Sequence, residues 1–197
     1  VVAVVRGRSE IGPRPLGRRS ILAVPTRSAW AALRRAAGYE WYQAPMASIA
    51  AERASALFDH PVWSPYMSFA VPLRPEAVAA FPGVAHVDNT SHIHTVTNGA
   101  DSWLWLLLWE AARCVGQPLL LHAPLQAPTR WSAEPQVLNT ASAVIERLRN
   151  ATGLDHALVE DHLFTREMVT RVPEGLEVEV LQGLAHSSRR VRHRRGL

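Results

Sequence analysis

The sequence predicts a single-domain α/β (α+β) fold in which helices flank a β-sheet, and three observations support this prediction. The chain of 197 residues is 48% hydrophobic and 19% charged, a balance typical of a protein with a buried core. Segments with the helical period of apolar residues alternate with segments that have the strand period of two. No repeat of fixed length interrupts this alternation. We therefore expect one domain over 1–170 and an extension over 171–197 that ends in a basic, disordered tail.

The first half of the chain contains two expected helices and three expected strands. An apolar run over 1–5 predicts the first strand, and a segment rich in alanine and arginine over 28–37 predicts the first helix. A second helix is expected over 47–58. Residues 68–73 alternate as in a strand, and 85–96 show more clearly the period of two expected when one strand face is buried.

The second half begins with the strongest helix prediction. Residues 103–115 are apolar on almost every side, so this helix is expected to be deeply packed and to end before Gly116. A strand is then expected over 118–121, a helix over 141–149, and a strand with a turn over 155–164.

Cysteine and tryptophan residues in the helix expected over 103–115 are interpreted as structural. The single cysteine, Cys114, excludes a disulfide framework, and its place in an apolar helix favours a buried thiol over a nucleophile. Trp103, Trp105 and Trp109 are likewise expected in the core rather than in a stacking site for a ligand.

The charged residues exclude several classes of protein. The 21 residues counted as lysine or arginine are all arginine, which excludes a P-loop, a Schiff-base enzyme and a lysine general base. The net charge is +4, but the last twelve residues contain five arginines and two histidines, so the rest of the chain is close to neutral. Binding of nucleic acid by this tail is the less favoured interpretation. No secretory signal or membrane-spanning segment is predicted, and we expect a cytoplasmic protein.

The most informative segment is 7–22, GRSEIGPRPLGRRSIL, in which three glycines, two prolines and four arginines surround one glutamate. It is expected to form a structured loop, because Gly12 and Gly17 allow turn conformations and Pro13 and Pro15 fix the backbone. Such a loop can hold an anion or a partner. A proline-rich turn with solvated arginines is the simpler interpretation.

Residues 10–22 resemble the EfGPRALGnRSIL signature that opens the C-terminal domain of the O-carbamoyltransferases of nodulation-factor and antibiotic biosynthesis. The matching positions are Glu10, Gly12, Pro13, Arg14, Leu16, Gly17, Arg19, Ser20, Ile21 and Leu22. The departures are Ile11, Pro15 and Arg18. The resemblance continues in the same order over roughly residues 1–168, in the segments 64–67, 85–96, 118–121, 139–140 and 152–164.

The resemblance implies a YrdC-like twisted mixed sheet with flanking helices. In that family this domain is the second lobe of the enzyme, which binds ATP and carbamoyl phosphate and forms a carbamoyl-adenylate. An actin-like N-terminal lobe binds metal and the acceptor alcohol and completes the transfer. The expected partners are therefore that lobe, as a separate chain or as missing sequence, and a small-molecule acceptor. ATP is the expected cofactor, and metal is expected only in the N-terminal lobe. The interlobe motif is expected to comprise Glu10, Gly12, Pro13, Arg14, Gly17 and Ser20.

Candidate ligands of ATP and carbamoyl phosphate follow from the phosphate-binding segments of that family. The candidates are Arg14, Arg19, Glu40, His92 and His122. A lysine and three arginines of the family segments are replaced here, at Ala37, Tyr39, Gln43 and His92. A charged hydrogen bond contributes about 1.5–3 kcal/mol, so four lost donors remove on the order of 6 kcal/mol of binding energy. Transferase activity therefore stays open at this point, and no catalytic residue is assigned.

Three histidines allow two interpretations. His92 and His94 lie two residues apart on an expected strand and so share a face, and His122 follows the next strand, so the three can converge on a metal ion. No HExxH motif, second cysteine or carboxylate at ligand spacing accompanies them. Polar strand residues that line a former pocket are therefore favoured, and no metal site is predicted. A protonated histidine at position 92 can still donate to a phosphate.

Three functions remain open from the sequence. The first is the C-terminal lobe of an O-carbamoyltransferase, which uses ATP to transfer carbamoyl from carbamoyl phosphate to a hydroxyl of a small metabolite. The second is a non-catalytic interaction or scaffold subunit that keeps the interlobe motif. The third is a nucleic-acid-binding YrdC-like domain, which is disfavoured because the body of the chain lacks interleaved aromatic and basic residues.

Overall fold

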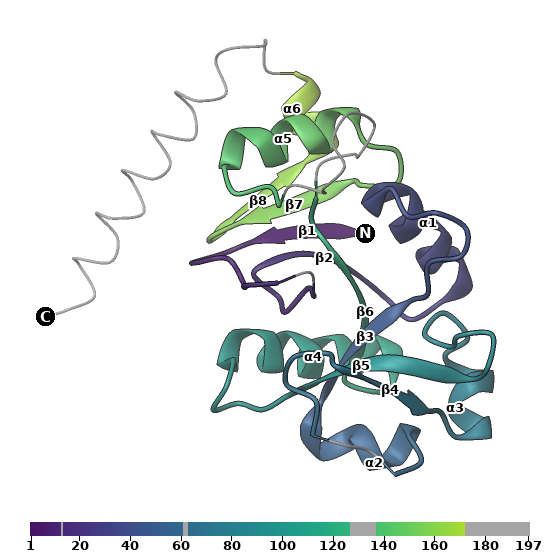
Figure 1. Ribbon diagram of the computed structural model, residues 1–197. Coiled ribbons are helices and arrows are strands. Elements are labelled where there is room, and N and C mark those ends of the chain that lie inside the picture. Colours follow the sequence, from purple (N-terminus) through teal and green to yellow (C-terminus); the bar gives the residue numbers. More distant parts are fainter. Residues whose placement is uncertain (13, 61–62, 127–136, 172–197) are drawn as a thin grey trace, which may run out of the picture.

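The computed structural model describes residues 1–12, 14–60, 63–126 and 137–171. In these residues eight strands form one mixed sheet in the order β4-β5-β3-β6-β2-β1-β7-β8 (Figure 1). The strands are β1 (Val2–Val5), β2 (Arg19–Ala23), β3 (Met46–Ala50), β4 (Phe69–Pro72), β5 (Thr90–Val96), β6 (Leu119–Pro124), β7 (His156–Val159) and β8 (His162–Thr165). The predicted single-domain α/β class is confirmed.

Helices connect most of the strands, and side chains cap the first turns of four of these helices. They are α1 (Arg27–Ala37), the 3-10 helix η1 (Ala51–Arg53), α2 (Ala54–Leu57), α3 (Pro75–Ala80), α4 (Ser102–Val115), α5 (Ala141–Asn150) and α6 (Arg166–Thr170). The side-chain oxygens of Thr26, Asp101, Thr140 and Thr165 accept backbone N–H groups at the starts of α1, α4, α5 and α6. Glycines in the left-handed conformation end α1 and α4.

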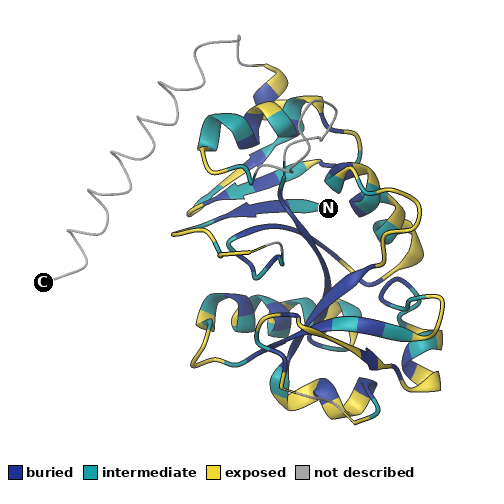
Figure 2. Ribbon diagram, viewed as in Figure 1, coloured by how far each residue is buried: buried dark blue, intermediate teal, exposed yellow. Residues whose placement is uncertain are grey.

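The two faces of the sheet are buried by different helices, because neighbouring residues of a strand point to opposite faces. One face carries the larger core, to which α1 contributes Leu33 and α5 contributes Leu148. The other face carries a smaller core around Leu104 and Leu108 of α4. Figure 2 shows the result, with the strands buried along most of their length and the helices exposed on their outer sides.

The pairing of the strands brings several connections together at one end of the sheet. Strand β3 runs parallel to β5, whereas β6 is antiparallel to both β3 and β2, so β6 ends where the other three begin. The connections into β2, β3 and β5 (residues 6–18, 38–45 and 81–89) therefore meet there, beside residues 125–126 that follow β6. The candidate site lies at this end.

Most of the predicted elements are confirmed, with changes at their ends. The expected first helix, the apolar helix and the last expected helix correspond to α1, α4 and α5, and the expected strand with a turn is the hairpin β7–β8. The strand predicted over 85–96 is shorter, because His86 and Asn89 close a backbone turn before β5. Asn89 has a left-handed φ of 61°, which ends any extended conformation before Thr90.

The helix predicted over 47–58 is wrong, because the first part of this segment belongs to β3, a central strand. All residues of β3 are buried, and its two edges pair with β5 and β6. A short apolar run has no period that separates a strand from a helix, and the helix propensity of alanine, although the highest of any residue, yields to pairing on both edges. The helical part of the segment is limited to η1 and α2.

The outer side of α4 is more exposed than the sequence predicts. Leu104 and Leu108 are its buried residues, whereas the Leu106 side chain is 56% exposed. Cys114 is also exposed, so the prediction of a buried thiol is wrong. The physical reason is that α4 contacts the sheet through β3 and β6, and the residues that point away from these strands meet solvent.

The tryptophans of α4 lie at the margin of the smaller core rather than inside it. Trp103 and Trp105 pack against that core while remaining partly exposed. The indole N–H groups of Trp105 and Trp109 both donate to Glu52 Oε1, over 2.8 and 3.0 Å. The Arg6 guanidinium lies 4.3 Å from the centre of the Trp103 ring. These residues therefore fasten α4 to the sheet and to η1.

Two parts of the sequence analysis lie outside the described residues. They are Pro13 and the basic tail, with nearly all of the extension predicted over 171–197. Within the residues that the structure describes, no helix is long and apolar enough to cross a membrane.

Candidate functional site

The connection 6–18 between β1 and β2 is folded around the carboxylate of Glu10. Glu10 Oε1 accepts the backbone N–H of Leu16 over 2.8 Å, and Oε2 accepts that of Arg19 over the same distance. The hydroxyl of Ser20 accepts the backbone N–H of Gly17 over 2.9 Å. Gly17 has a φ of 93°, and an added Cβ would lie 2.9 Å from the Leu104 side chain, so the loop approaches α4 closely. The acidic residue of this segment thus stabilises the loop itself.

Arg19 holds the base of the same loop. Its side chain is buried, and Nη1 donates to the carbonyl oxygens of Arg6 and Arg18 over 3.1 and 3.0 Å. Nη2 donates to the carbonyl oxygen of Gly7 over 2.9 Å. The guanidinium is therefore occupied by backbone carbonyls and lies outside the pocket described next.

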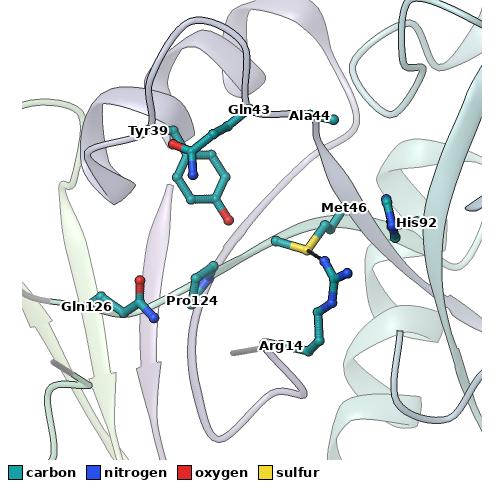
Figure 3. A pocket seen from close by; sticks show the side chains of 8 residues that line it. All are labelled: Arg14, Tyr39, Gln43, Ala44, Met46, His92, Pro124 and Gln126. Carbon is teal, nitrogen blue, oxygen red and sulfur yellow. Dashed lines mark hydrogen bonds between the residues drawn. The ribbon is translucent and has the colours of Figure 1, made fainter. Parts of the chain in front are cut away.

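A polar pocket of about 350 Å³ opens beside this loop at the end of the sheet (Figure 3). Its lining residues come from the loop, from the connection between α1 and β3, and from β3, β5, β6 and the residues after β6. They are Arg14, Tyr39, Gln43, Ala44, Met46, His92, Pro124 and Gln126. Figure 3 shows the Tyr39 hydroxyl and the Arg14 guanidinium pointing into the same space from opposite sides.

Neighbouring side chains and burial determine the protonation states of the hydrogen-bond donors in the pocket. The Arg14 guanidinium lies against the Met46 side chain, with 3.6 Å between Nη1 and Sδ. Burial raises the pKa of the Tyr39 phenol, against a smaller effect of Arg14, so this side chain stays a neutral O–H donor. Burial, and then the charges of Arg14 and His86, lower the pKa of His92. Among the eight lining residues only Arg14 carries a fixed charge.

Next to the pocket, a buried polar cluster crosses three strands. Ser48 Oγ on β3 lies 3.1 Å from His94 Nδ1 on β5 and 2.5 Å from His122 Nδ1 on β6. His122 is fully buried, and its Nε2 has no hydrogen-bond partner among the described residues. Burial lowers the pKa of His94 to about 4 and lowers that of His122 well below its ordinary value, so both rings are neutral near pH 7.

A second cavity of about 330 Å³ has a different character. It is lined by apolar side chains of α4, among them Trp103 and Leu107, and of β1, β2, β6, β7 and β8, among them Val4 and Leu163. It offers no charged side chain to a ligand. The polar pocket is therefore the candidate functional site.

The structure brings together two of the five candidate ligands. Arg14 and His92 line the pocket, whereas Arg19 is held beneath the loop. Glu40 is exposed on the connection before β3 and does not line the pocket. His122 lies in the buried cluster, opposite Met46 in the pairing of β3 and β6. In the described part of the chain, no group of three or more histidine, cysteine, aspartate or glutamate side chains is placed to hold a metal ion.

The sequence analysis missed several lining residues. Tyr39 and Gln43 stand where the family segment has arginines, so their position in a phosphate-binding segment was the available signal. Met46 and Gln126 also lie in segments that correspond to family segments, over 37–47 and 121–126, but neither was chosen as a candidate. The assembled pocket offers a guanidinium, a phenol, an imidazole and two amides, which together suit an oxyanion. Its lining contains no serine, cysteine or lysine that acts as a nucleophile.

The chain is similar to known proteins over most of its length. Residues 1–166 match the family described as Carbamoyltransferase C-terminus. The nodulation protein NolNO of Sinorhizobium fredii is 33% identical over 182 residues, which cover 88% of this chain and 25% of NolNO. Nodulation protein U of Rhizobium tropici is 30% identical over 172 residues, covering 87% of this chain and 28% of that protein. Nodulation protein NolO of Bradyrhizobium diazoefficiens is 31% identical over 168 residues, covering 81% and 29%.

This chain spans less than a third of the length of these relatives. The family match includes the loop around Glu10 and all eight strands of the sheet. The chain therefore belongs to the carbamoyltransferase family, in which it corresponds to the C-terminal region.

Proposed function

We propose that this chain is the C-terminal lobe of an O-carbamoyltransferase and that the pocket around Arg14 and His92 binds a phosphate group of carbamoyl phosphate or ATP. The observation that carries the proposal is the composition of this pocket. Arg14, Tyr39, Gln43 and His92 come from the three segments that resemble the family's phosphate-binding segments, and they line one cavity. The reaction that we propose is the ATP-dependent transfer of carbamoyl to a hydroxyl of a small metabolite.

The pocket supports this proposal through the kind of donors that it offers. Arg14 supplies a fixed positive charge and a fork of N–H groups, which suits a phosphate. The Tyr39 hydroxyl faces it and adds a neutral donor. The amides of Gln43 and Gln126 can donate to further oxygens.

Completion of the transfer is proposed to need a second lobe. The chain covers only 25 to 29% of the relatives' length, and the eight lining residues include no serine, cysteine or lysine that could take the carbamoyl group. We therefore propose that an actin-like N-terminal lobe provides the metal and the binding site for the acceptor. The acceptor would meet the activated carbamoyl group only in the assembled enzyme.

Calorimetric titration of the purified chain with ATP and with carbamoyl phosphate tests the proposal. Arg14→Gln is expected to weaken binding about 10-fold to 100-fold, because a charged hydrogen bond contributes about 1.5–3 kcal/mol. Arg53→Gln is the matched control, since Arg53 is exposed on η1 and donates to Gln117 outside the pocket. Equal weakening by both substitutions, or no binding of either ligand to the folded wild type, would contradict the proposal.

A second candidate function is a non-catalytic interaction subunit, and two observations favour it. Arg14 is the only fixed charge among the eight lining residues. Ile11, Trp41 and Tyr42 stand in the connections that carry lining residues, and their side chains are 100%, 81% and 68% exposed. Exposed apolar groups of this size suit contact with another protein. A folded chain that ignores both phosphate ligands but binds a separately produced N-terminal lobe would favour this function.

A further inference from the structure

We propose that the pocket takes up a proton together with its oxyanion: His92 is neutral in the free protein and becomes a second cation when the anion binds beside Arg14. The inference rests on the proposed function, because it specifies the ligand charge that the same pocket selects. It makes the affinity for the ligand fall as the pH rises.

His92 stands between two basic groups. Arg14 approaches it from the β1–β2 loop, and both side chains line the pocket (Figure 3). The His86 ring, from the turn before β5, has its centre 5.3 Å from the centre of the His92 ring. The residues opposite His92 on β3 and β4 are Met46 and Ala70, which have no charge. On its own strand the next side chain on this face is the neutral His94.

Two contacts hold the His86 ring in place. Nε2 lies 2.8 Å from the carbonyl oxygen of Pro45, which can only accept. Nδ1 lies 2.9 Å from Thr90 Oγ1, and the hydroxyl of Thr90 donates its proton to Asp88 Oδ1 over 2.8 Å. These contacts fix the His86 ring beside the ring of His92.

Burial and the neighbouring basic groups oppose a charge on His92 in the free protein. Burial lowers the pKa of His92 first, and the charges of Arg14 and His86 add to this effect. An oxyanion placed between Arg14 and His92 attracts the proton that these groups repel, and it accepts a hydrogen bond from the protonated ring. Binding of the anion and binding of the proton therefore favour each other.

Position 92 is a histidine in this chain and an arginine in the family segment, and the two side chains give the pocket a different dependence on pH. An arginine would keep its charge throughout the physiological range, so its contribution to binding would not change with pH. A histidine adds its charge only when the ligand compensates it. The pocket is therefore suited to an oxyanion with two negative charges, which matches Arg14 and a protonated His92.

Sulfate is a suitable probe, because its charge is the same at about pH 6 and at about pH 8, so a pH dependence of its binding comes from the protein. The folded wild-type chain is titrated calorimetrically at both pH values, in two buffers with different ionisation enthalpies. We expect binding about tenfold or more tighter at the lower pH, with net proton uptake from the buffer. The same titration with carbamoyl phosphate follows at one pH.

Substitutions identify the residue that takes up the proton when sulfate binds. His92→Gln should abolish both the pH dependence and the proton uptake, and His92→Arg should bind sulfate tightly at both pH values. His162→Gln, on β8 at the far edge of the sheet, should behave as the wild type. Uptake that persists in His92→Gln would overturn the inference. Binding of sulfate and carbamoyl phosphate without proton uptake would overturn it while leaving the proposed function standing, whereas absence of any binding would overturn both.

Discussion

Acid is expected to destabilise the fold through the buried cluster of Ser48, His94 and His122. The hydroxyl of Ser48 has one proton, and its oxygen lies within hydrogen-bonding distance of Nδ1 of both histidines. One ring must therefore accept from the hydroxyl while the other donates to it, which holds when both rings are neutral. A proton added to the accepting Nδ1 would place two donors against each other in a buried site, where an unpaired polar group costs about 1–3 kcal/mol.

The magnitude follows from the pKa of His94, which burial lowers from 6.5 to about 4. Below about pH 6.5, the ordinary pKa of histidine, the unfolded chain therefore binds more protons than the folded chain. The neutral histidine thus contributes stability that is complete above about pH 6.5 and is lost as the pH falls toward 4. At about pH 5 the loss from His94 alone is about 2 kcal/mol. His122 shifts in the same direction and adds to it.

Urea unfolding at about pH 7.5 and about pH 5 measures this loss for the wild type and for His94→Gln. The glutamine amide can still donate to and accept from Ser48 but does not titrate, so its loss should be about 2 kcal/mol smaller. His162→Gln controls for the removal of a histidine from a partly exposed position on β8. If wild type and His94→Gln lost the same free energy of unfolding between the two pH values, the reasoning from the buried cluster would be refuted.

Three further predictions concern the loop, a close backbone contact and the thiol. Glu10→Gln should lower the free energy of unfolding by about 1.5–3 kcal/mol, since the amide turns N–H groups toward the backbone donors of the loop; unchanged urea midpoints would contradict this. Gly153→Ala should cost more than about 1 kcal/mol in the same assay, because Gly153 has a φ of 85° and an added Cβ would lie 2.6 Å from the carbonyl oxygen of Ala32; a stable, unshifted variant would contradict it. The exposed thiol of Cys114 should react with a disulfide reagent in the folded protein as fast as a free thiol, and reaction only at the rate of unfolding would show that it is covered.

The elements that could be predicted from the sequence are those whose ends are fixed locally. Thr26 caps α1 and Gly38 ends it, and Asp101 and Gly116 do the same for α4. These signals act over a few residues, so they are visible in the sequence without knowledge of the sheet. β3 is the opposite case, because its strand conformation depends on partners in β5 and β6 that lie far along the chain.

The candidate site could be predicted only in part, for a related reason. The sequence identified the segments that contain Arg14, Tyr39 and His92, since each lies in a recognisable pattern. Their convergence depends on the order of the strands, which brings the starts of β3 and β5 beside the end of β6. Pocket residues such as Gln126 take their role from that arrangement alone.

The motif residues Arg14 and Arg19 show why a charged residue type does not by itself identify a ligand contact. Both lie in one loop and both match the family signature, yet the terminal nitrogens of Arg19 already donate to three backbone carbonyls. Glu10 is occupied in the same way by backbone N–H groups. An anion can compete for Arg19 only by leaving buried carbonyls unpaired, which costs about as much as the new contacts provide. Among the residues that the structure describes, Arg14 donates to no backbone carbonyl, and its Nη1 contacts the weakly accepting sulfur of Met46. It is therefore the charge of this loop that can face a ligand.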